Sequence, residues 1–181
     1  MGNYWIDYTD IDSDSNGIWD NPYIIDSDRD YQPLVMPGEN YFAAPKNVLD
    51  TGQPANPYPS IMGCHTGTIK TNHTIIATKL YTYHCEGTGG HTEYAKIWNA
   101  TWDATATWEG YGSDWNNIVF DKTVVLLANE TYNYTIRTGS YPQIHHNKIL
   151  TLPNGEFTCL KFTDANGQVY YDMIPAIRLF Q

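Results

Sequence analysis

The chain has few basic residues and no long apolar run. It carries 10 Lys and Arg against 20 Asp and Glu over 181 residues, a formal net charge of -10. Binding to nucleic-acid phosphates needs clustered Lys and Arg, and none cluster here, so we expect no nucleic-acid partner. No stretch approaches the roughly 20 apolar residues that cross a bilayer, and the amino terminus lacks a signal-peptide pattern. We therefore expect a soluble protein without direct membrane insertion.

Cysteine is scarce and odd in number, at positions 64, 85 and 159. Such a set is compatible with one disulfide and a leftover thiol in an oxidising compartment. It is equally compatible with three reduced, buried thiols in a cytosol, and the spacing does not choose between the two.

Familiar catalytic motifs are also missing. The sequence has no Gly-x-Ser-x-Gly elbow and no glycine-rich loop that would cradle phosphates. A glycosidase needs two carboxylates placed across a bond. Candidates for such a pair are Glu86, Glu93, Glu109, Asp114 and Glu130. Nothing in their spacing selects two, so we expect no enzymatic activity.

Negative charge is concentrated at one end of the chain. Residues 1–45 hold nine carboxylates against the single Arg29, whereas the remainder is nearly balanced. Most prolines lie between residues 22 and 59 and indicate an extended connector. We therefore predict an acidic segment with its connector at 1–45 and a folded domain at 46–181.

The second part is rich in Thr, Tyr, Trp, Val and Ile and is interrupted by Gly, Asn and Pro, which favours short strands. Residues 131–138 alternate cleanly, with Tyr132, Tyr134 and Ile136 on one face. In residues 74–83, alternation places Ile76 with Leu80. Further strands are expected at 93–99, 101–107, 122–128, 156–162, 168–172 and 175–179, with a hairpin turn at 164–167. The pattern predicts an all-β, antiparallel, jelly-roll-like β-sandwich.

The acidic segment contains a calcium-loop pattern, D12-S-D-S-N-G-I-W-D20. Oxygen-bearing residues occupy positions 1, 3, 5 and 9, with Gly at position 6. Position 12 is Tyr23 rather than a bidentate Glu, so a later carboxylate would have to complete the shell. The predicted calcium ligands are Asp12, Asp14, Asn16, the Ile18 carbonyl and Asp20, completed by Asp26 or Asp28. The alternative is a solvated acidic linker without metal.

Histidines and aromatic residues suggest two further kinds of site. His65, His91, Glu93 and His145 could bind zinc or copper if they converge; otherwise each His caps a loop by hydrogen bonding. A second group could stack on sugar rings or pack in the core. It comprises Trp98, Trp102, Trp108, Tyr111 and Trp115.

Four N-glycosylation sequons suggest export, although β proteins rich in Asn and Thr also contain such triplets by chance. They begin at Asn72, Asn99, Asn129 and Asn133.

Several motifs carry a resemblance to a known family. Residues 3–8 (NYWIDY), the acidic loop, residues 21–26 (NPYIID) and residues 31–34 (YQPL) resemble the terminal segment of NosD-type right-handed β-helix repeats in surface proteins of methanogenic archaea. The remainder resembles a domain that accompanies those repeats, for which no activity is established. The motifs are 56–61 (NPYPSI), 65–69 (HTGTI), 87–94 (GTGGHTEY), 132–136 (YNYTI) and 174–179 (IPAIRL).

This resemblance implies an extracellular address, association with S-layer or envelope proteins, and a disulfide between Cys85 and Cys159, with Cys64 as an extra thiol. It also implies that the chain is part of, or related to, a longer array. We therefore expect a non-enzymatic, calcium-binding cell-surface module with a structural or adhesive role. Its expected partners are envelope proteins or glycans, including further copies of itself. The first alternative is a carbohydrate-binding module, and the second is a polysaccharide-acting hydrolase.

Overall fold

The computed structural model describes residues 5, 7–13, 18–26, 28–35, 48–112 and 114–181. The chain divides into two units, residues 1–46 and 47–181. All regular elements of the described residues are strands, and every pairing between them is antiparallel. The predicted all-β antiparallel class is therefore confirmed. Across the same residues there is no helix that is long and apolar enough to span a membrane.

The first unit is a small aromatic assembly around one hairpin. Strands β1 (Tyr23–Ile25) and β2 (Asp28–Asp30) pair with each other. The Trp5 ring stacks on Tyr23 with centroids 4.7 Å apart, and its Nε1 donates a hydrogen bond to Asp30 Oδ2 at 3.0 Å. An isolated bridge between Ile18 and Leu34 joins residues on the two sides of the hairpin. Aromatic stacking and carboxylate hydrogen bonds thus connect the described parts of this acidic segment.

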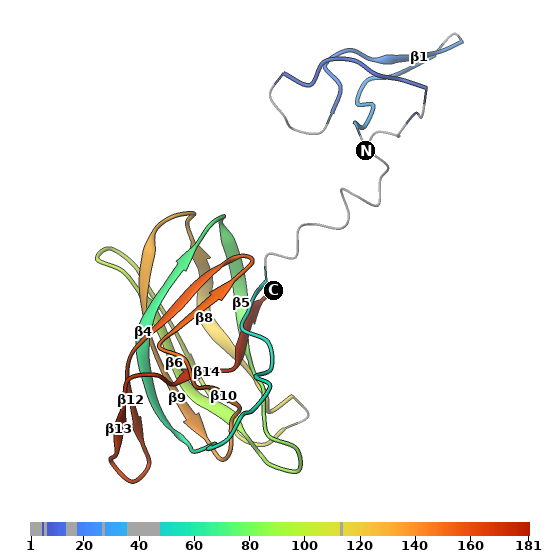
Figure 1. The fold of residues 1–181 in the computed structure, drawn as a ribbon. Helices are drawn as coiled ribbons and strands as arrows, with labels where there is room; N and C mark the ends of the chain where they lie inside the picture. The colour runs from blue at the N-terminus through green and yellow to red at the C-terminus, as the bar shows by residue number, and fades with distance from the viewer. Residues whose placement is uncertain (1–4, 6, 14–17, 27, 36–47, 113) are drawn as a thin grey trace. The chain divides into compact units, whose positions relative to one another are not determined.

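The second unit is built on one long antiparallel sheet that curls until it is nearly closed (Figure 1). In pairing order its strands are β11 (Ile149–Leu152), β12 (Gly155–Asp164), β4 (Gly63–Thr71), β9 (Thr131–Gly139), β6 (His91–Trp98), β7 (Asp103–Thr107), β8 (Asn117–Leu126), β5 (Ile75–Thr82), β15 (Ile177–Phe180) and β3 (Leu49–Asp50). Strand β13 (Val169–Tyr170) also pairs with β12. A separate short pair joins β10 (Ile144–His145) to β14 (Ile174–Pro175).

The core lies inside this curled sheet. Strand β9 behaves as its alternation predicts, because Tyr132, Tyr134 and Ile136 are buried while their neighbours face outward. Side chains from distant strands complete the same cluster, including Ile69, Phe157 and Leu179. The turn predicted at 164–167 joins β12 to β13, with Gly167 at a positive φ of 84°.

A β-bulge reverses the predicted faces in the first part of β5, before Lys79. The pairing of β5 with β8 shifts register between Ala77 and Lys79. Ile75 is therefore buried on the same side as Leu80, whereas Ile76 points outward, opposite to the expectation from simple alternation. An extra residue in one strand shifts the inside-outside phase, and it also bends the strand, which helps the sheet to curl.

The sequence analysis missed β4, although it lies centrally between β12 and β9. Its Gly67 makes room for the Tyr134 ring of β9, the residue directly opposite. A Cβ at Gly67 would lie 2.0 Å from the Thr158 carbonyl oxygen and 2.6 Å from the Tyr134 ring. Glycine is therefore the residue that fits at this crossing, because any side chain would overlap these atoms.

We predict that Gly67→Ala destabilises the protein by about 2 to 3 kcal/mol, because the methyl group overlaps backbone that cannot easily move. Denaturant unfolding measures this change. Gly112→Ala is the matched control, since nothing lies within 4 Å of its Cβ position. Equal stability of the two variants would contradict the close crossing of β4 and β9.

His65 of β4 is a fully buried imidazole. Its ring stacks on Phe162 with centroids 4.2 Å apart, and its Nδ1 donates to the Met173 carbonyl at 3.2 Å. No partner for its Nε2 exists among the described residues. Burial disfavours the imidazolium and lowers the pKa of His65 from 6.5 to about 4, so this histidine is neutral at physiological pH.

We predict that His65 makes the fold acid-sensitive. Because its folded pKa lies below its unfolded pKa, its contribution is complete above pH 6.5 and is lost as the pH falls towards 4. The loss amounts to about 3 kcal/mol. The measurement is the free energy of unfolding of wild type and His65→Phe between pH 7 and 4. Over this range the variant should lose about 3 kcal/mol less stability than wild type. Parallel pH curves would refute the assignment.

Candidate functional site

Two loops at one end of the sheet form the candidate site. The first connects β5 to β6 through residues 83–90, and the second connects β7 to β8 through residues 108–116. Gly87 and Gly110 allow the turns by adopting positive φ angles of 73° and 106°. Both loops leave strands that pair within the long sheet, so the site stands on rigid supports.

The Asn116 side chain ties the two loops together. Its Nδ2 lies 2.8 Å from His84 Nδ1 and 3.3 Å from the Gly90 carbonyl oxygen. The His84 ring also packs against Trp115, with centroids 5.2 Å apart. Sequence reasoning missed both residues, because an amide that bridges segments some thirty positions apart leaves no local pattern.

Buried His91 supports the aromatic wall of the site. It is 4% exposed, stacks on Trp108 with centroids 3.7 Å apart, and donates from Nδ1 to the Gly89 carbonyl at 2.6 Å. Gly139 lies opposite His91 in β9, and a Cβ there would lie 2.5 Å from its Nε2. The glycine thus provides the space that the imidazole fills, and the imidazole covers one face of Trp108.

Tyr111 completes the aromatic group at the surface. Its ring meets Trp108 edge-on at 4.7 Å and lies 5.9 Å from Trp115, yet 65% of the residue is exposed. The Trp108 Nε1 donates to the Trp115 carbonyl at 3.0 Å, which fixes the indole and satisfies its only donor. These three rings therefore form an ordered, partly exposed apolar surface.

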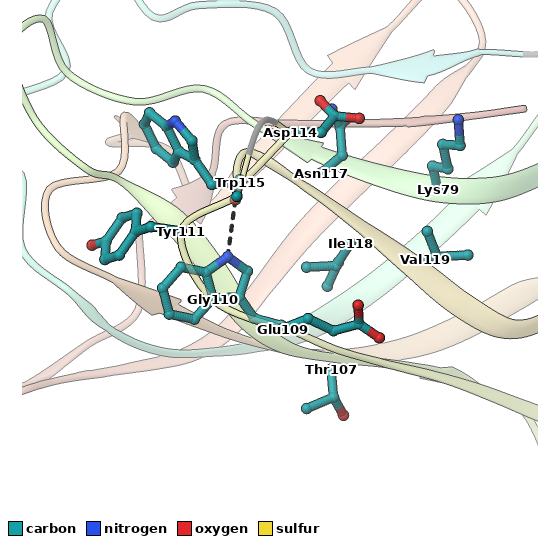
Figure 2. A pocket seen from close by; sticks show the side chains of 12 residues that line it. Lys79, Thr107, Glu109, Gly110, Tyr111, Asp114, Trp115, Asn117, Ile118 and Val119 are labelled. Carbon is teal, nitrogen blue, oxygen red and sulfur yellow. Dashed lines mark hydrogen bonds between the residues drawn. The ribbon is translucent and has the colours of Figure 1, made fainter.

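A cleft of about 440 Å³ lies beside these rings. Figure 2 shows the aromatic side chains on one side of the view and Lys79 with Val119 on the other. Polar groups also border the cleft, among them the carboxylates of Glu109 and Asp114 and the amide of Asn117. The volume falls in the range of small-molecule sites, which combine apolar walls with a few polar groups.

The five aromatic residues predicted to act together divide into two groups. Trp108, Tyr111 and Trp115 gather at the cleft, whereas Trp98 and Trp102 lie at the opposite end of β6. Trp102 and Trp108 both pack partly against the core, but Trp102 meets Tyr132 edge-on at 6.3 Å and does not line the cleft. Only the first group forms a candidate binding surface.

The predicted transition-metal set does not assemble into one centre. Each of the three imidazoles is hydrogen-bonded to a different backbone carbonyl. His65 bonds to Met173, His91 to Gly89 and His145 to Gly52. Glu93 does lie near His91 over Gly139, but its carboxylate pairs with Arg137 at 2.9 Å. Among the described residues, no group of three or more His, Cys, Asp or Glu is placed to hold a metal ion.

The described residues do not test the calcium prediction. Asp14 and Asn16 lie outside the described residues. Of the other proposed ligands, Asp20 accepts hydrogen bonds from the Ser13 hydroxyl and amide at 2.6 and 3.2 Å, and Asp28 accepts one from the Arg29 amide. Asp26 has a positive φ of 51° next to β1, and Ile18 forms the bridge to Leu34. Calcium binding therefore stays a prediction.

The structure also lacks the disulfide that the resemblance implies, since Cys64, Cys85 and Cys159 are all free. Cys159 belongs to the main core cluster, whereas the Cys85 thiol follows β5 and lies 3.9 Å from the Pro142 carbonyl. The two sulfurs thus have different surroundings. Burial raises the pKa of the Cys64 and Cys159 thiols, which disfavours their reactive thiolate forms.

The sequon asparagines lie at or near the surface. Asn72 and Asn129 are exposed, and Asn99 and Asn133 are half-exposed. The Asn72 side-chain amide donates to the Pro153 carbonyl at 2.7 Å. The Asn99 side-chain oxygen accepts hydrogen bonds from the backbone amides of Thr101 and Trp102. Asn133 points outward from β9, as predicted.

Comparison with known proteins gives no relative for this geometry. No protein-family model, curated protein or solved structure matches the chain.

Proposed function

We propose that residues 47–181 form a carbohydrate-binding module whose binding site is the cleft beside Trp108, Tyr111 and Trp115. The observation that carries the proposal is the ordered aromatic surface at the edge of a cleft bordered by carboxylates and an amide. Sugar rings present apolar C–H faces and hydroxyl edges. Aromatic rings can stack on the C–H faces, and fixed polar groups can form hydrogen bonds with the hydroxyls.

Exposure supports a binding role for Tyr111 in particular. A large ring that is 65% exposed contributes little to the core, yet two aromatic neighbours hold it in place. Preordering of this kind lowers the entropic cost of binding. The cleft can therefore receive a ligand without rearranging its wall.

We predict that Tyr111→Ala weakens oligosaccharide binding about tenfold, the equivalent of 1.4 kcal/mol, because a stacking surface is lost. Isothermal titration calorimetry of the full chain with gluco-, xylo-, manno- and chito-oligosaccharides measures the effect. Tyr171→Ala is the control, since Tyr171 is similarly exposed, at 63%, and does not line the cleft. If no sugar binds, or if both variants weaken binding equally, the assignment fails.

The same titrations distinguish binding from hydrolysis. Glu109 and Asp114 border one cleft, and two carboxylates across a sugar are what a glycosidase requires. Chromatography of the sugars after incubation should recover them at their original length. Shortened products that disappear in Glu109→Gln would instead identify a hydrolase.

For the acidic first unit we propose a structural calcium site. The supporting observation is that the two ends of its loop meet, since the Asp20 amide donates to the Ile11 carbonyl at 2.8 Å and Ser13 bonds the Asp20 carboxylate. A cation held within the closed loop would neutralise like charges. The ion would stabilise the fold and perform no chemistry.

We predict that calcium at 100 times its Kd stabilises this unit by about 2.7 kcal/mol relative to excess chelator. Thermal unfolding followed by tryptophan fluorescence, together with metal analysis, measures the shift. Asp14→Ala should lower the melting temperature in calcium and leave it unchanged in chelator. An equal loss in both conditions would argue against Asp14 as a ligand.

An extracellular, cell-surface setting suits both proposals. Surface-lying sequons at Asn129 and Asn133, together with a glycan-binding cleft, support a module that attaches an envelope protein to glycans or to other envelope proteins. The resemblance to NosD-type archaeal surface proteins points in the same direction.

A further inference from the structure

The charged groups at the cleft indicate which sugars it selects. Three ionisable side chains with formal charge border it, the carboxylates of Glu109 and Asp114 and the ammonium of Lys79. Lys79 already has an aromatic partner, because its Nζ lies 5.8 Å from the centroid of the Phe180 ring. Asp114 accepts a 2.5 Å hydrogen bond from Asn117 Nδ2. Within the described part of the chain, the Glu109 carboxylate has no hydrogen-bond or ion-pair partner.

The acceptors on the rim of the cleft include the Glu109 carboxylate, which has no partner among the described residues. Two side-chain donors beside it already have acceptors, since the Trp108 Nε1 is bound to the Trp115 carbonyl and the Tyr111 hydroxyl points to the Gly89 carbonyl at 3.4 Å. The Lys79 ammonium and the Thr107 hydroxyl are further donors at the cleft. A ligand group that donates hydrogen bonds therefore suits Glu109 in particular.

The aromatic wall adds an attraction for positive charge. The faces of Trp and Tyr rings carry negative potential and attract ammonium groups, and a nearby carboxylate strengthens this preference. Trp108, Tyr111 and Trp115 supply the rings, and Glu109 supplies the unpaired charge. A protonated amine is attracted both by the ring faces and by the Glu109 carboxylate. A carboxylate or an acetamido group brings no positive charge and is attracted less.

We propose that the cleft selects oligosaccharides with free amino groups, such as polymers of 2-amino-2-deoxyglucose, over neutral, N-acetylated or acidic sugars. This inference rests on the proposed carbohydrate-binding function and assigns its ligand class. Glu109 is the residue that determines the selectivity, and Lys79 is a neighbouring cation that opposes it.

The test is calorimetric titration of the full chain with four hexasaccharides at pH 6 and low salt: glucosamine, N-acetylglucosamine, glucose and galacturonate oligomers. We expect the glucosamine oligomer to bind at least tenfold more tightly than the other three, and its affinity to fall as salt screens the charges. Glu109→Gln should reduce that preference about fivefold or more. Lys79→Met should strengthen glucosamine binding, because it removes a cation that repels the ligand.

Asp172→Asn is the matched control, because it removes one exposed carboxylate that does not line the cleft and should change nothing. Melting temperatures verify that each variant folds. Neutral or acetylated sugars that bind as tightly as glucosamine, or an inert Glu109→Gln, would overturn the selectivity and leave the carbohydrate-binding function standing. If the galacturonate oligomer binds more tightly and Lys79→Met abolishes that binding, the cleft selects negatively charged sugars. That result would also overturn the proposed selectivity. Absence of binding to all four would overturn both proposals.

Discussion

The close crossing of β4 and β9 constrains much of the second unit. Tyr134 is fully buried, and its ring occupies the space that a side chain at Gly67 would fill. Since β4 lies between β12 and β9, this contact fixes the spacing of three neighbouring strands. An aromatic ring over a cross-strand glycine restores the buried apolar area that the glycine lacks. The strands that build the functional end continue from this centre, because β9 pairs with β6 and β6 with β7.

Bulges connect the curvature of the sheet to the position of the site. Register shifts occur in β5, in β12 and between Thr92 and Tyr94 of β6. The shift in β6 comes directly after His91 and Thr92, which pair in regular register with Gly139 and Thr138. His91 stacks on Trp108, and the Glu93 carboxylate, which lies over the same Gly139 position, pairs with Arg137. A bulge bends its strand, so β6 bends next to the residue that supports Trp108.

Sequence patterns predicted the strands whose side chains alternate simply, and they failed where packing depends on glycine or a bulge. The alternation at Tyr132, Tyr134 and Ile136 and the Asn166-Gly167 turn are local signals, and both were confirmed. Strand β4 was missed because Gly, Thr and His dilute its apolar character, although the strand is central. For the site, composition indicated aromatic residues but could not divide them between two ends of a hairpin, nor reveal the Asn116 bridge, because both depend on contacts between distant segments.

The position of the cleft bears on how an acidic chain could carry the selective site that we propose. Negative charge over the whole molecule repels polyanions at long range, but that field is screened within about 10 Å at ordinary salt and cannot discriminate among sugars by itself. Discrimination requires a charge close to the ligand and held in a fixed frame. Glu109 directly follows Trp108 in the sequence. The Trp108 indole is held by stacking on His91 and by its hydrogen bond to the Trp115 carbonyl, so the backbone next to Glu109 is restrained. The buried stack thus connects the rigid sheet to the carboxylate that we propose meets the ligand.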